Sequence, residues 1–375
     1  MILMGKRILL MYISEYSGHH QASIALEKAI LAKDPASCVL NVNAFRYASP
    51  ITEKVINELY MKIIKRRPEI WGYLYDNPKV IKKTKRLKSF VYNRGSKKIG
   101  RLIKQFRPDV IGCTQAYPCV LAAEYKKTHK NNMPVVGILT DYAPHTYWIH
   151  ESVDAYIVPS TETGDTFIKK GVPSEKIKPL GIPIDPLFEA PLNKSAIRKK
   201  FGLLPKLPAV LVMGGSQGIG PNEKLIKALD GSSTGFQVIM ITGVNKKLSK
   251  KIENAKTLFR KKLILMGFTD KIHELMEISD IIITKPGGLT TAEALKKTLP
   301  MIILNPLPGQ ESFNTTALTG KGVALKARDE RDAVKLVEKL LNNPDRIKKM
   351  KNAIRADSKP RSATDAAELL LRLAG

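Results

Sequence analysis

The chain of 375 residues has few cysteines and no long apolar run. Its three cysteines, Cys38, Cys113 and Cys119, are scattered and form no metal-type pair, which predicts reduced thiols rather than a disulfide framework. No window holds the roughly 20 apolar residues that a membrane-spanning helix needs. The first residues lead directly into a strand pattern, so we expect no signal peptide and a cytoplasmic location.

Acidic residues are also scarce, with 34 Asp and Glu against 62 Lys and Arg and a net charge of +28. Half of this excess lies in residues 60–107, the basic segment, which has 16 lysines and arginines against two acids. Basic residues mixed with aromatics are typical of a surface for anionic lipid. Nucleic acid, or a solvated basic face without a partner, would explain the charge equally well. The predicted membrane-contacting residues are Trp71, Lys82, Lys83, Lys85 and Arg86.

Strand and helix patterns alternate along two halves of the chain, which predicts an α/β fold with two parallel sheets. The expected strands are residues 7–13, 39–42, 109–114, 135–140 and 155–158, then 209–213, 236–242, 263–266, 281–284 and 301–304. Prolines cluster in residues 181–188 and mark a boundary. We therefore expect an N-terminal domain at 1–188, a C-terminal domain at 189–360 and a terminal helix at 361–375.

The segment at residues 281–295 carries the most information about function. A β-branched run ends at Thr284, a Pro-Gly-Gly turn follows, and a helix begins near Thr290 with Glu293 one turn in. A helix N-terminus presents unpaired N–H groups and the positive end of the helix dipole, so it binds anions. This arrangement predicts a site for a nucleoside diphosphate. A glycine turn that only ends a parallel strand is the alternative.

A second glycine-rich loop follows the strand at residues 209–213. Gly214, Gly215, Ser216, Gln217 and Gly218 could form a backbone nest for the diphosphate or the donor sugar. A turn that packs a helix against the sheet fits the pattern equally well.

The run Thr-Lys-Pro-Gly-Gly-Leu-Thr-Thr-Ala-Glu-Ala-Leu resembles the donor-binding motif of the diacylglycerol glycosyltransferases. These include the processive diacylglycerol glucosyltransferases and the monogalactosyldiacylglycerol synthases, and MurG-type enzymes are related to them. The resemblance extends over nearly the whole chain and is weakest in residues 53–107. It implies a GT-B fold, in which two Rossmann-like domains face a cleft and the helix at 361–375 crosses back to the first domain.

The resemblance also implies donor-binding roles for particular residues. Glu293 would hold the ribose, and backbone near Phe268 would meet the uracil. The turn and the glycine loop would stabilise the departing diphosphate. The segment Pro-Gly-Gln-Glu would read the hexose. The donor set is completed by Pro286, Gly287, Gly288, Leu289, Thr290, Gln310, Glu311 and Asn314.

The candidate base lies in the first half of the chain. In Ser17-Gly18-His19-His20-Gln21-Ala22-Ser23, which we expect to be a loop up to His20, His20 matches the family histidine and His19 is its rival. A histidine titrates near neutrality and can take a proton from a hydroxyl nucleophile. Asp141, at the end of another strand, would orient His20, assist deprotonation or touch the acceptor. Core packing is the favoured role for Trp148 and His145.

These observations predict an inverting enzyme that moves a hexose from a UDP-sugar to a hydroxyl of diacylglycerol at the inner face of the cell membrane. No Asp-x-Asp pair lies at a strand end near the donor site, in agreement with a family that needs no catalytic metal, so we expect no cofactor. The alternatives are a MurG-like transferase for a polyprenyl-linked acceptor, a UDP-sugar epimerase, and a non-catalytic nucleic-acid-binding protein.

Overall fold

The computed structural model describes residues 5–15, 17–48, 97–142, 146–215 and 222–375. Most of the basic segment, with its predicted membrane-contacting residues Trp71, Lys82, Lys83, Lys85 and Arg86, lies outside the described residues. His145, Ser216, Gln217 and Gly218 lie outside them too. The roles predicted for these residues therefore stay predictions.

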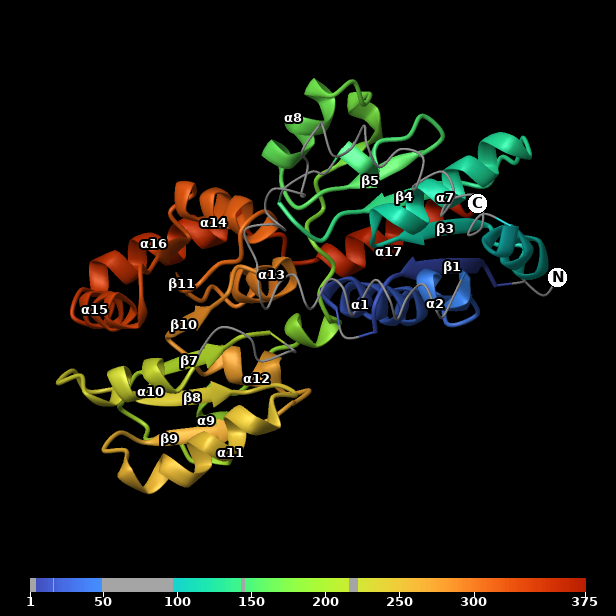
Figure 1. Ribbon diagram of the computed structural model, residues 1–375. Helices are drawn as coiled ribbons and strands as arrows, with labels where there is room; N and C mark the ends of the chain where they lie inside the picture. The colour runs from blue at the N-terminus through green and yellow to red at the C-terminus, as the bar shows by residue number, and fades with distance from the viewer. Residues whose placement is uncertain (1–4, 16, 49–96, 143–145, 216–221) are drawn as a thin grey trace. The chain divides into compact units, whose positions relative to one another are not determined.

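The chain folds into two compact units (Figure 1). The first comprises Met1–Pro186, Leu307–Gln310 and Arg361–Gly375, and the second comprises Leu187–Pro306 and Glu311–Pro360. The main part of the first unit thus ends within the proline-rich stretch. Two later segments, Leu307–Gln310 and Arg361–Gly375 with the C-terminal helix, also belong to this unit.

The first unit contains a sheet of six parallel strands. Their order is β2 (Cys38–Asn43), β1 (Arg7–Tyr12), β3 (Val110–Cys113), β4 (Val135–Ile138), β5 (Ala155–Ile157) and β6 (Ile177–Lys178). Side chains of β1 alternate between the faces, so Ile8 and Leu10 belong to one core and Leu9 and Met11 to the other. The first core includes α1 (Gly18–Lys33) and α17 (Ser362–Leu373), and the second includes α7 (Ala116–Thr128).

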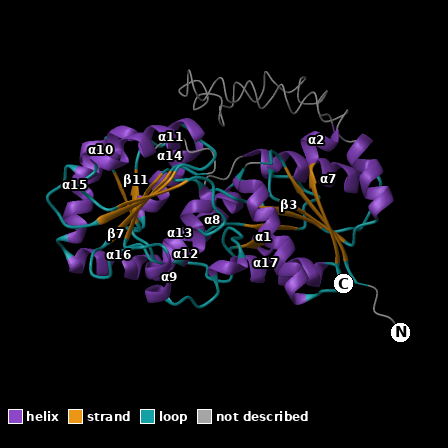
Figure 2. Ribbon diagram, turned by 90° about the horizontal axis from the view of Figure 1, so that it is seen from below, coloured by secondary structure: helices purple, strands orange, loops and turns teal. Residues whose placement is uncertain are grey.

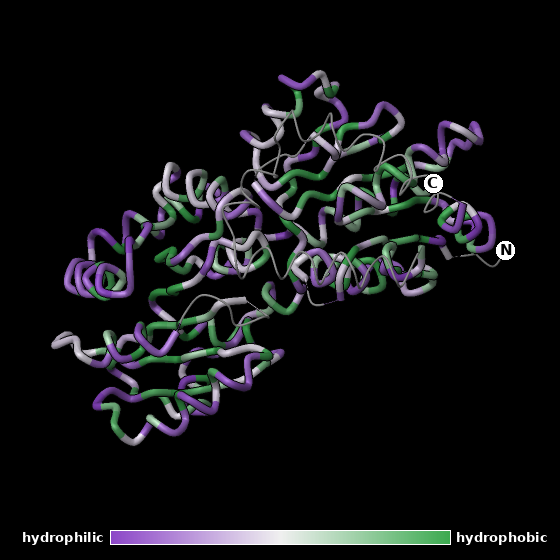
Figure 3. Tube along the Cα trace, viewed as in Figure 1, coloured by the Kyte–Doolittle hydropathy of each residue, from purple (hydrophilic) through white to green (hydrophobic). Residues whose placement is uncertain are grey.

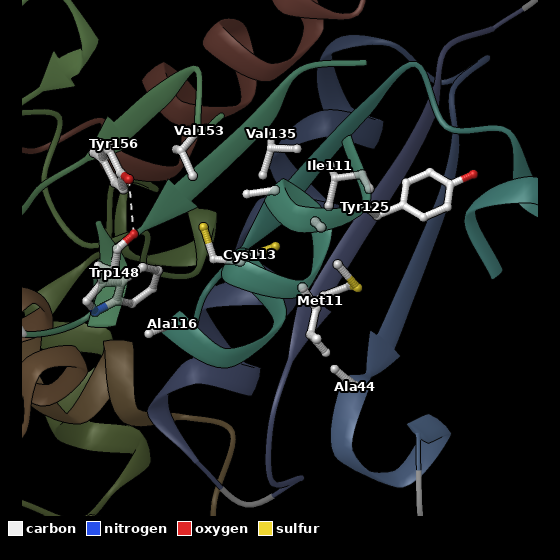
Figure 4. Packing of buried hydrophobic residues seen from close by; sticks show 14 of the residues in the cluster. Met11, Ala44, Ile111, Cys113, Ala116, Tyr125, Val135, Trp148, Val153 and Tyr156 are labelled. Atoms are coloured by element: carbon white, nitrogen blue, oxygen red, sulfur yellow. Dashed lines mark hydrogen bonds between the residues drawn. The ribbon is translucent and has the colours of Figure 1, made fainter. Parts of the chain in front are cut away.

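The core on the α7 side is built of buried hydrophobic side chains (Figure 4). Trp148 is only 6% exposed, and its carbonyl oxygen accepts a hydrogen bond of 3.0 Å from the Tyr156 hydroxyl. The packing role favoured for Trp148 is therefore confirmed. Tyr156 also meets the Phe167 ring edge to face, with centroids 5.0 Å apart.

The second unit repeats this plan with helices on both faces of its sheet (Figure 2). The strand order is β12 (Ala324–Lys326), β11 (Met301–Ile303), β10 (Ile281–Thr284), β7 (Ala209–Met213), β8 (Gln237–Ile241) and β9 (Leu263–Met266). Strands β7, β9 and β10 have the predicted bounds. Every residue of β7, β8 and β10 is buried, and Figure 3 shows these strands as hydrophobic, as expected of a parallel sheet covered on both faces.

The second unit also contains a series of helices. They are α9 (Lys194–Lys200), α10 (Glu223–Asp230), α11 (Lys246–Ala255), α12 (Ile272–Glu277), α13 (Gly288–Lys296), α14 (Gln310–Gly320), α15 (Glu330–Leu341) and α16 (Pro344–Asp357). The remaining α-helices with described bounds are α2 (Ala44–Ala48) and α8 (Thr161–Lys169), both in the first unit. No helix in the described part of the chain is long and apolar enough to cross a membrane.

Strand order reverses once in each sheet, between β1 and β3 in the first unit and between β7 and β10 in the second. Ligands of open α/β sheets bind outside the carboxyl ends of the strands at such a switch point. In the second unit that point lies between the glycine loop after β7 and the Pro-Gly-Gly turn after β10. The predicted fold class, two Rossmann-like α/β units, is confirmed.

Candidate active site

The turn after β10 exposes the N-terminus of α13. Gly287 is the N-cap residue, with φ −67° and ψ 136°, and no side chain caps the helix. The first bond that closes back on the turn runs from the Thr291 amide to the Gly287 carbonyl at 3.0 Å. The amides of the first turn, from Gly288 to Thr290, therefore have no acceptor within the helix, which is the arrangement that binds anions at helix N-termini.

Open space lies over both glycine segments. A Cβ placed on Gly287 or on Gly215 would have no heavy atom within 4 Å. Gly215 has φ +70°, in the left-handed region that favours glycine. The backbone at both positions is thus accessible to a ligand, as the predicted diphosphate site requires.

Helix α14 packs against the Pro-Gly-Gly turn and holds it through a hydrogen bond. The Asn314 side chain is fully buried, and its Nδ2 donates to the Pro286 carbonyl at 2.9 Å. One turn earlier on the same face, Glu311 pairs with Lys285, with 2.9 Å between Oε1 and Nζ. Two residues of the predicted donor set, Glu311 and Asn314, therefore contact the Pro-Gly-Gly turn or the lysine that precedes it.

Lys285 is a charged residue at this edge of the sheet to which sequence reasoning assigned no role. It directly follows β10, and its side chain and that of Glu311 are only 11% and 19% exposed. The ion pair is thus largely removed from water at the edge where an anion would bind. The signal available in the sequence was a lysine at the end of a strand that is buried throughout.

The other predicted donor residues line the same edge of the sheet. Leu289, Thr290 and Glu293 lie on α13 and are part-buried, and Gln310 is the first residue of α14. Phe268 follows β9 and is 64% exposed. Because β7 and β8 lie between β10 and β9, Phe268 lies farther along this edge than the turn does.

In the first unit, α1 begins earlier than predicted. Residues 18–20 belong to the first turn of the helix and not to a loop, because the Ser17 hydroxyl caps it and accepts from the His20 amide at 3.3 Å. The Ser17 hydroxyl also donates to the Ile13 and Ser14 carbonyls. Both histidines are therefore held by a capped helix at the switch point between β1 and β3.

His20 is oriented as a proton acceptor. Its Nδ1 lies 2.6 Å from the Glu15 carbonyl oxygen, which can only accept, so Nδ1 carries the hydrogen and Nε2 the lone pair. The imidazole also stacks on Tyr12, with centroids 4.1 Å apart and planes at 14°. Among the described residues nothing donates a hydrogen bond to Nε2. The ring is fixed in the tautomer that a general base needs.

His19, unlike His20, is engaged in hydrogen bonds that link α1 to two strands of the sheet. Its Nδ1 donates to the Thr114 carbonyl at 2.9 Å and lies 2.7 Å from the Thr140 hydroxyl, while Thr114 Oγ1 donates to the His19 carbonyl. These bonds tie α1 to the ends of β3 and β4. Burial lowers the pKa of His19 to about 4, against a smaller opposing effect of the Thr114 hydrogen bond. So weak a base is poorly matched to proton transfer at neutral pH.

The depressed pKa of His19 makes stability depend on pH. The unfolded chain protonates this histidine below about pH 6.5, whereas the folded protein does so only near pH 4. We expect the free energy of unfolding to fall by as much as ~3 kcal/mol as pH drops across this window. Urea unfolding at several pH values measures it.

His19→Asn should flatten this pH dependence, because the amide can still donate to Thr114 but does not titrate. The exposed His129 supplies the control, since His129→Asn should leave the slope unchanged. An equal slope in wild type and His19→Asn would contradict the assignment.

Asp141 lies two residues beyond Leu139, at the carboxyl end of β4, and is part-buried. Its neighbour Thr140 contacts His19, so Asp141 borders the same switch point as the two histidines. Within the described residues, no group of three or more His, Cys, Asp or Glu side chains is arranged to hold a metal ion.

Comparison with known proteins agrees with this geometry. Residues 19–184 match the monogalactosyldiacylglycerol (MGDG) synthase family, and residues 209–370 match the glycosyltransferase family 28 C-terminal domain. The processive diacylglycerol beta-glucosyltransferase of Bacillus subtilis (strain 168) is 28% identical over 351 residues, 94% of this chain and 91% of that protein.

Solved structures share the fold at low sequence identity. Acinetobacter baumannii MurG has a TM-score of 0.67 at 15% identity and covers 98% of this chain and 99% of its own. The UDP-GlcNAc 2-epimerase of Neisseria meningitidis has a TM-score of 0.63 at 15% identity, with 97% and 99% covered. At this identity the likeness concerns the fold alone.

The fold and the exposed turn after β10 define a GT-B protein of the glycosyltransferase type. Each family match lies mainly in one unit, and over most of its length the chain is similar to the diacylglycerol glycosyltransferases. The resemblance inferred from the sequence is therefore confirmed. The nucleic-acid-binding alternative accounted for the charge but not for these matches.

Proposed function

We propose that this protein transfers a hexose from a UDP-sugar to a hydroxyl of diacylglycerol. The observation that carries the proposal is the open, uncapped N-terminus of α13 at the switch point of the second sheet. The relatives of this chain include a processive diacylglycerol beta-glucosyltransferase. Diphosphate charge that grows in the transition state would meet the amides of Gly288 to Thr290. Phe268, farther along the same edge, would meet the uracil.

The B. subtilis relative is a beta-glucosyltransferase, and donor UDP-glucose is α-linked. A β product from an α donor requires inversion in a single displacement, with the acceptor hydroxyl deprotonated by His20.

A transfer assay tests this proposal. The protein is incubated with radiolabelled UDP-glucose, UDP-galactose or UDP-N-acetylglucosamine, together with diacylglycerol, polyprenyl phosphates or no acceptor. Label in diacylglycerol supports the proposal, and label only in a polyprenyl product or an epimerised nucleotide overturns it. Activity in EDTA is expected to equal activity without it.

Glu293 is proposed to hold the ribose. Loss of hydrogen bonds to a charged group costs roughly 1.5–3 kcal/mol. Glu293→Ala should therefore weaken UDP binding about tenfold or more, as measured by calorimetry on the folded variant. Unchanged UDP affinity would remove Glu293 from the site.

The basic segment is proposed to bring the enzyme to anionic membranes, where its acceptor resides. Replacing Lys82, Lys83, Lys85 and Arg86 by Ser should reduce binding to vesicles that contain anionic lipid and leave UDP affinity unchanged. Wild-type binding should weaken with salt, because the Debye length falls from about 10 Å at 0.1 M to about 3 Å at 1 M. Equal binding to neutral and anionic vesicles would contradict the proposal.

A further inference from the structure

The second unit contains a polar pocket of about 350 Å³ at the C-terminal end of α13. Helix α13 starts at the carboxyl end of β10 and runs back along the sheet. This pocket therefore lies near the amino ends of the strands, whereas the candidate donor site lies at their carboxyl ends. Five of its lining side chains are cationic and two are acidic: Lys194, Lys296, Lys297, Lys351 and Arg355, with Glu189 and Glu277.

One acid already serves two of these cations. Glu277 lies 2.9 Å from Lys297 Nζ and 3.2 Å from Lys194 Nζ. The Lys297 side chain is only 5% exposed, and its ammonium lies 6.0 Å from the centre of the Phe188 ring. Glu277 is therefore engaged by Lys194 and Lys297 and does not pair with the other cations of the pocket.

The remaining cations have fewer acidic neighbours. Lys296 Nζ donates to the Pro360 carbonyl at 3.0 Å, and burial lowers the pKa of Lys296 against the opposing charge of Glu189. Lys351 and Arg355 lie one turn apart on α16 and so share a face. Among the described residues neither forms an ion pair, and Arg355 hydrogen-bonds only to the Asn352 side chain.

Helix capping explains part of this cluster. Cations near a helix C-terminus are stabilised by the helix dipole, and Lys296 and Lys297 lie at the end of α13. The dipole of α13 gives no reason for Lys351 and Arg355, which a different helix brings to the same pocket. Glu189 and Glu277 offset only part of the five positive charges, so an anion that binds between the two helices would relieve the remaining repulsion.

We propose that this pocket binds the phosphoryl group of a phosphate ester, with Lys296, Lys351 and Arg355 as its ligands. A guanidinium offers paired donors that match phosphate oxygens, and the two ammonium groups add point charges. The volume is at the lower end of the range for small-molecule sites, which fits a phosphoryl group with a small alcohol attached. The source is either a soluble phosphate ester or a phospholipid headgroup, and the proposal does not depend on the transferase activity.

The test uses calorimetry with glycerol 3-phosphate while saturating UDP occupies the donor site. Wild type should bind, and the double variant Lys351→Ser/Arg355→Ser should bind at least tenfold more weakly, since two charged hydrogen bonds are lost. The matched control is Lys348→Ser/Lys349→Ser, which removes the same charge from exposed positions of α16 outside the pocket. The control should bind within twofold of wild type, and all proteins should melt alike.

A second arm identifies the source with vesicles of phosphatidylcholine alone or with phosphatidylglycerol. If binding to phosphatidylglycerol vesicles falls in Lys351→Ser/Arg355→Ser and not in the control, the site takes a lipid headgroup. If only glycerol 3-phosphate binding responds, the site takes a soluble ester. No saturable binding of either probe, or equal weakening in both double variants, overturns the proposal.

Discussion

Replacing His20 by Ala should lower the turnover rate roughly 10²–10⁴-fold, which is the usual contribution of a general base, and leave UDP affinity close to wild type. The reason is the arrangement of the ring: Nδ1 donates to the Glu15 carbonyl, so only Nε2 can receive the acceptor proton. Steady-state transfer with labelled UDP-sugar and calorimetry with UDP measure the two quantities separately.

His20→Asn sharpens this experiment. The asparagine amide can still donate to the Glu15 carbonyl, but it cannot accept a proton at neutral pH. If His20 acts as the base, the Asn and Ala variants should be equally slow. If its role is only to order the start of α1, His20→Asn should retain most of the activity, and Asp141 would become the leading base.

The neighbouring histidine supplies the matched control. His19→Asn preserves a donor to the Thr114 carbonyl, and at pH 7.5 the lost imidazole was neutral in the folded protein. We expect its turnover within tenfold of wild type. A dead His19→Asn with an active His20→Ala would shift the assignment by one residue.

The parallel sheets were predictable because their strands are continuous apolar runs bounded by turn residues. The run Ile281–Thr284 could hardly be a surface element, and its predicted bounds are those observed. Strands β6 and β12 were missed, since segments of two and three residues at a sheet edge leave no periodic signal. The start of α1 was misplaced because Gly-His-His has weak helix propensity and only the Ser17 cap sets the boundary.

Ion pairs between distant segments left no sequence signal. No partner for Lys285 was evident from the sequence, because Glu311 lies beyond another helix and strand in the chain. Glu311 was assigned to the hexose, and the structure shows that one of its oxygens is engaged by Lys285. Which groups a carboxylate meets is decided by tertiary packing, and motif order does not encode it.

Removing Lys285 should have a large effect on stability. Lys285→Met leaves Glu311 largely buried without its ammonium partner, and breaking a buried pair from one side costs roughly 3–5 kcal/mol of unfolding free energy. The double variant Lys285→Met/Glu311→Gln should lose much less, because no unpaired charge remains. Urea unfolding of the wild type, both single variants and the double variant yields the coupling energy.

The same variants separate support of the turn from contact with the donor. Lys285 directly precedes the turn that would hold the diphosphate, so its charge is expected to favour UDP as well as to hold Glu311. The double variant should then regain stability while its UDP affinity stays at least tenfold below wild type. The pair Lys321–Asp357 in the same unit, with exposures of 17% and 19%, is the matched control. Its removal should change stability and leave UDP affinity unchanged, whereas full UDP affinity in the Lys285→Met/Glu311→Gln protein would limit Lys285 to holding the turn.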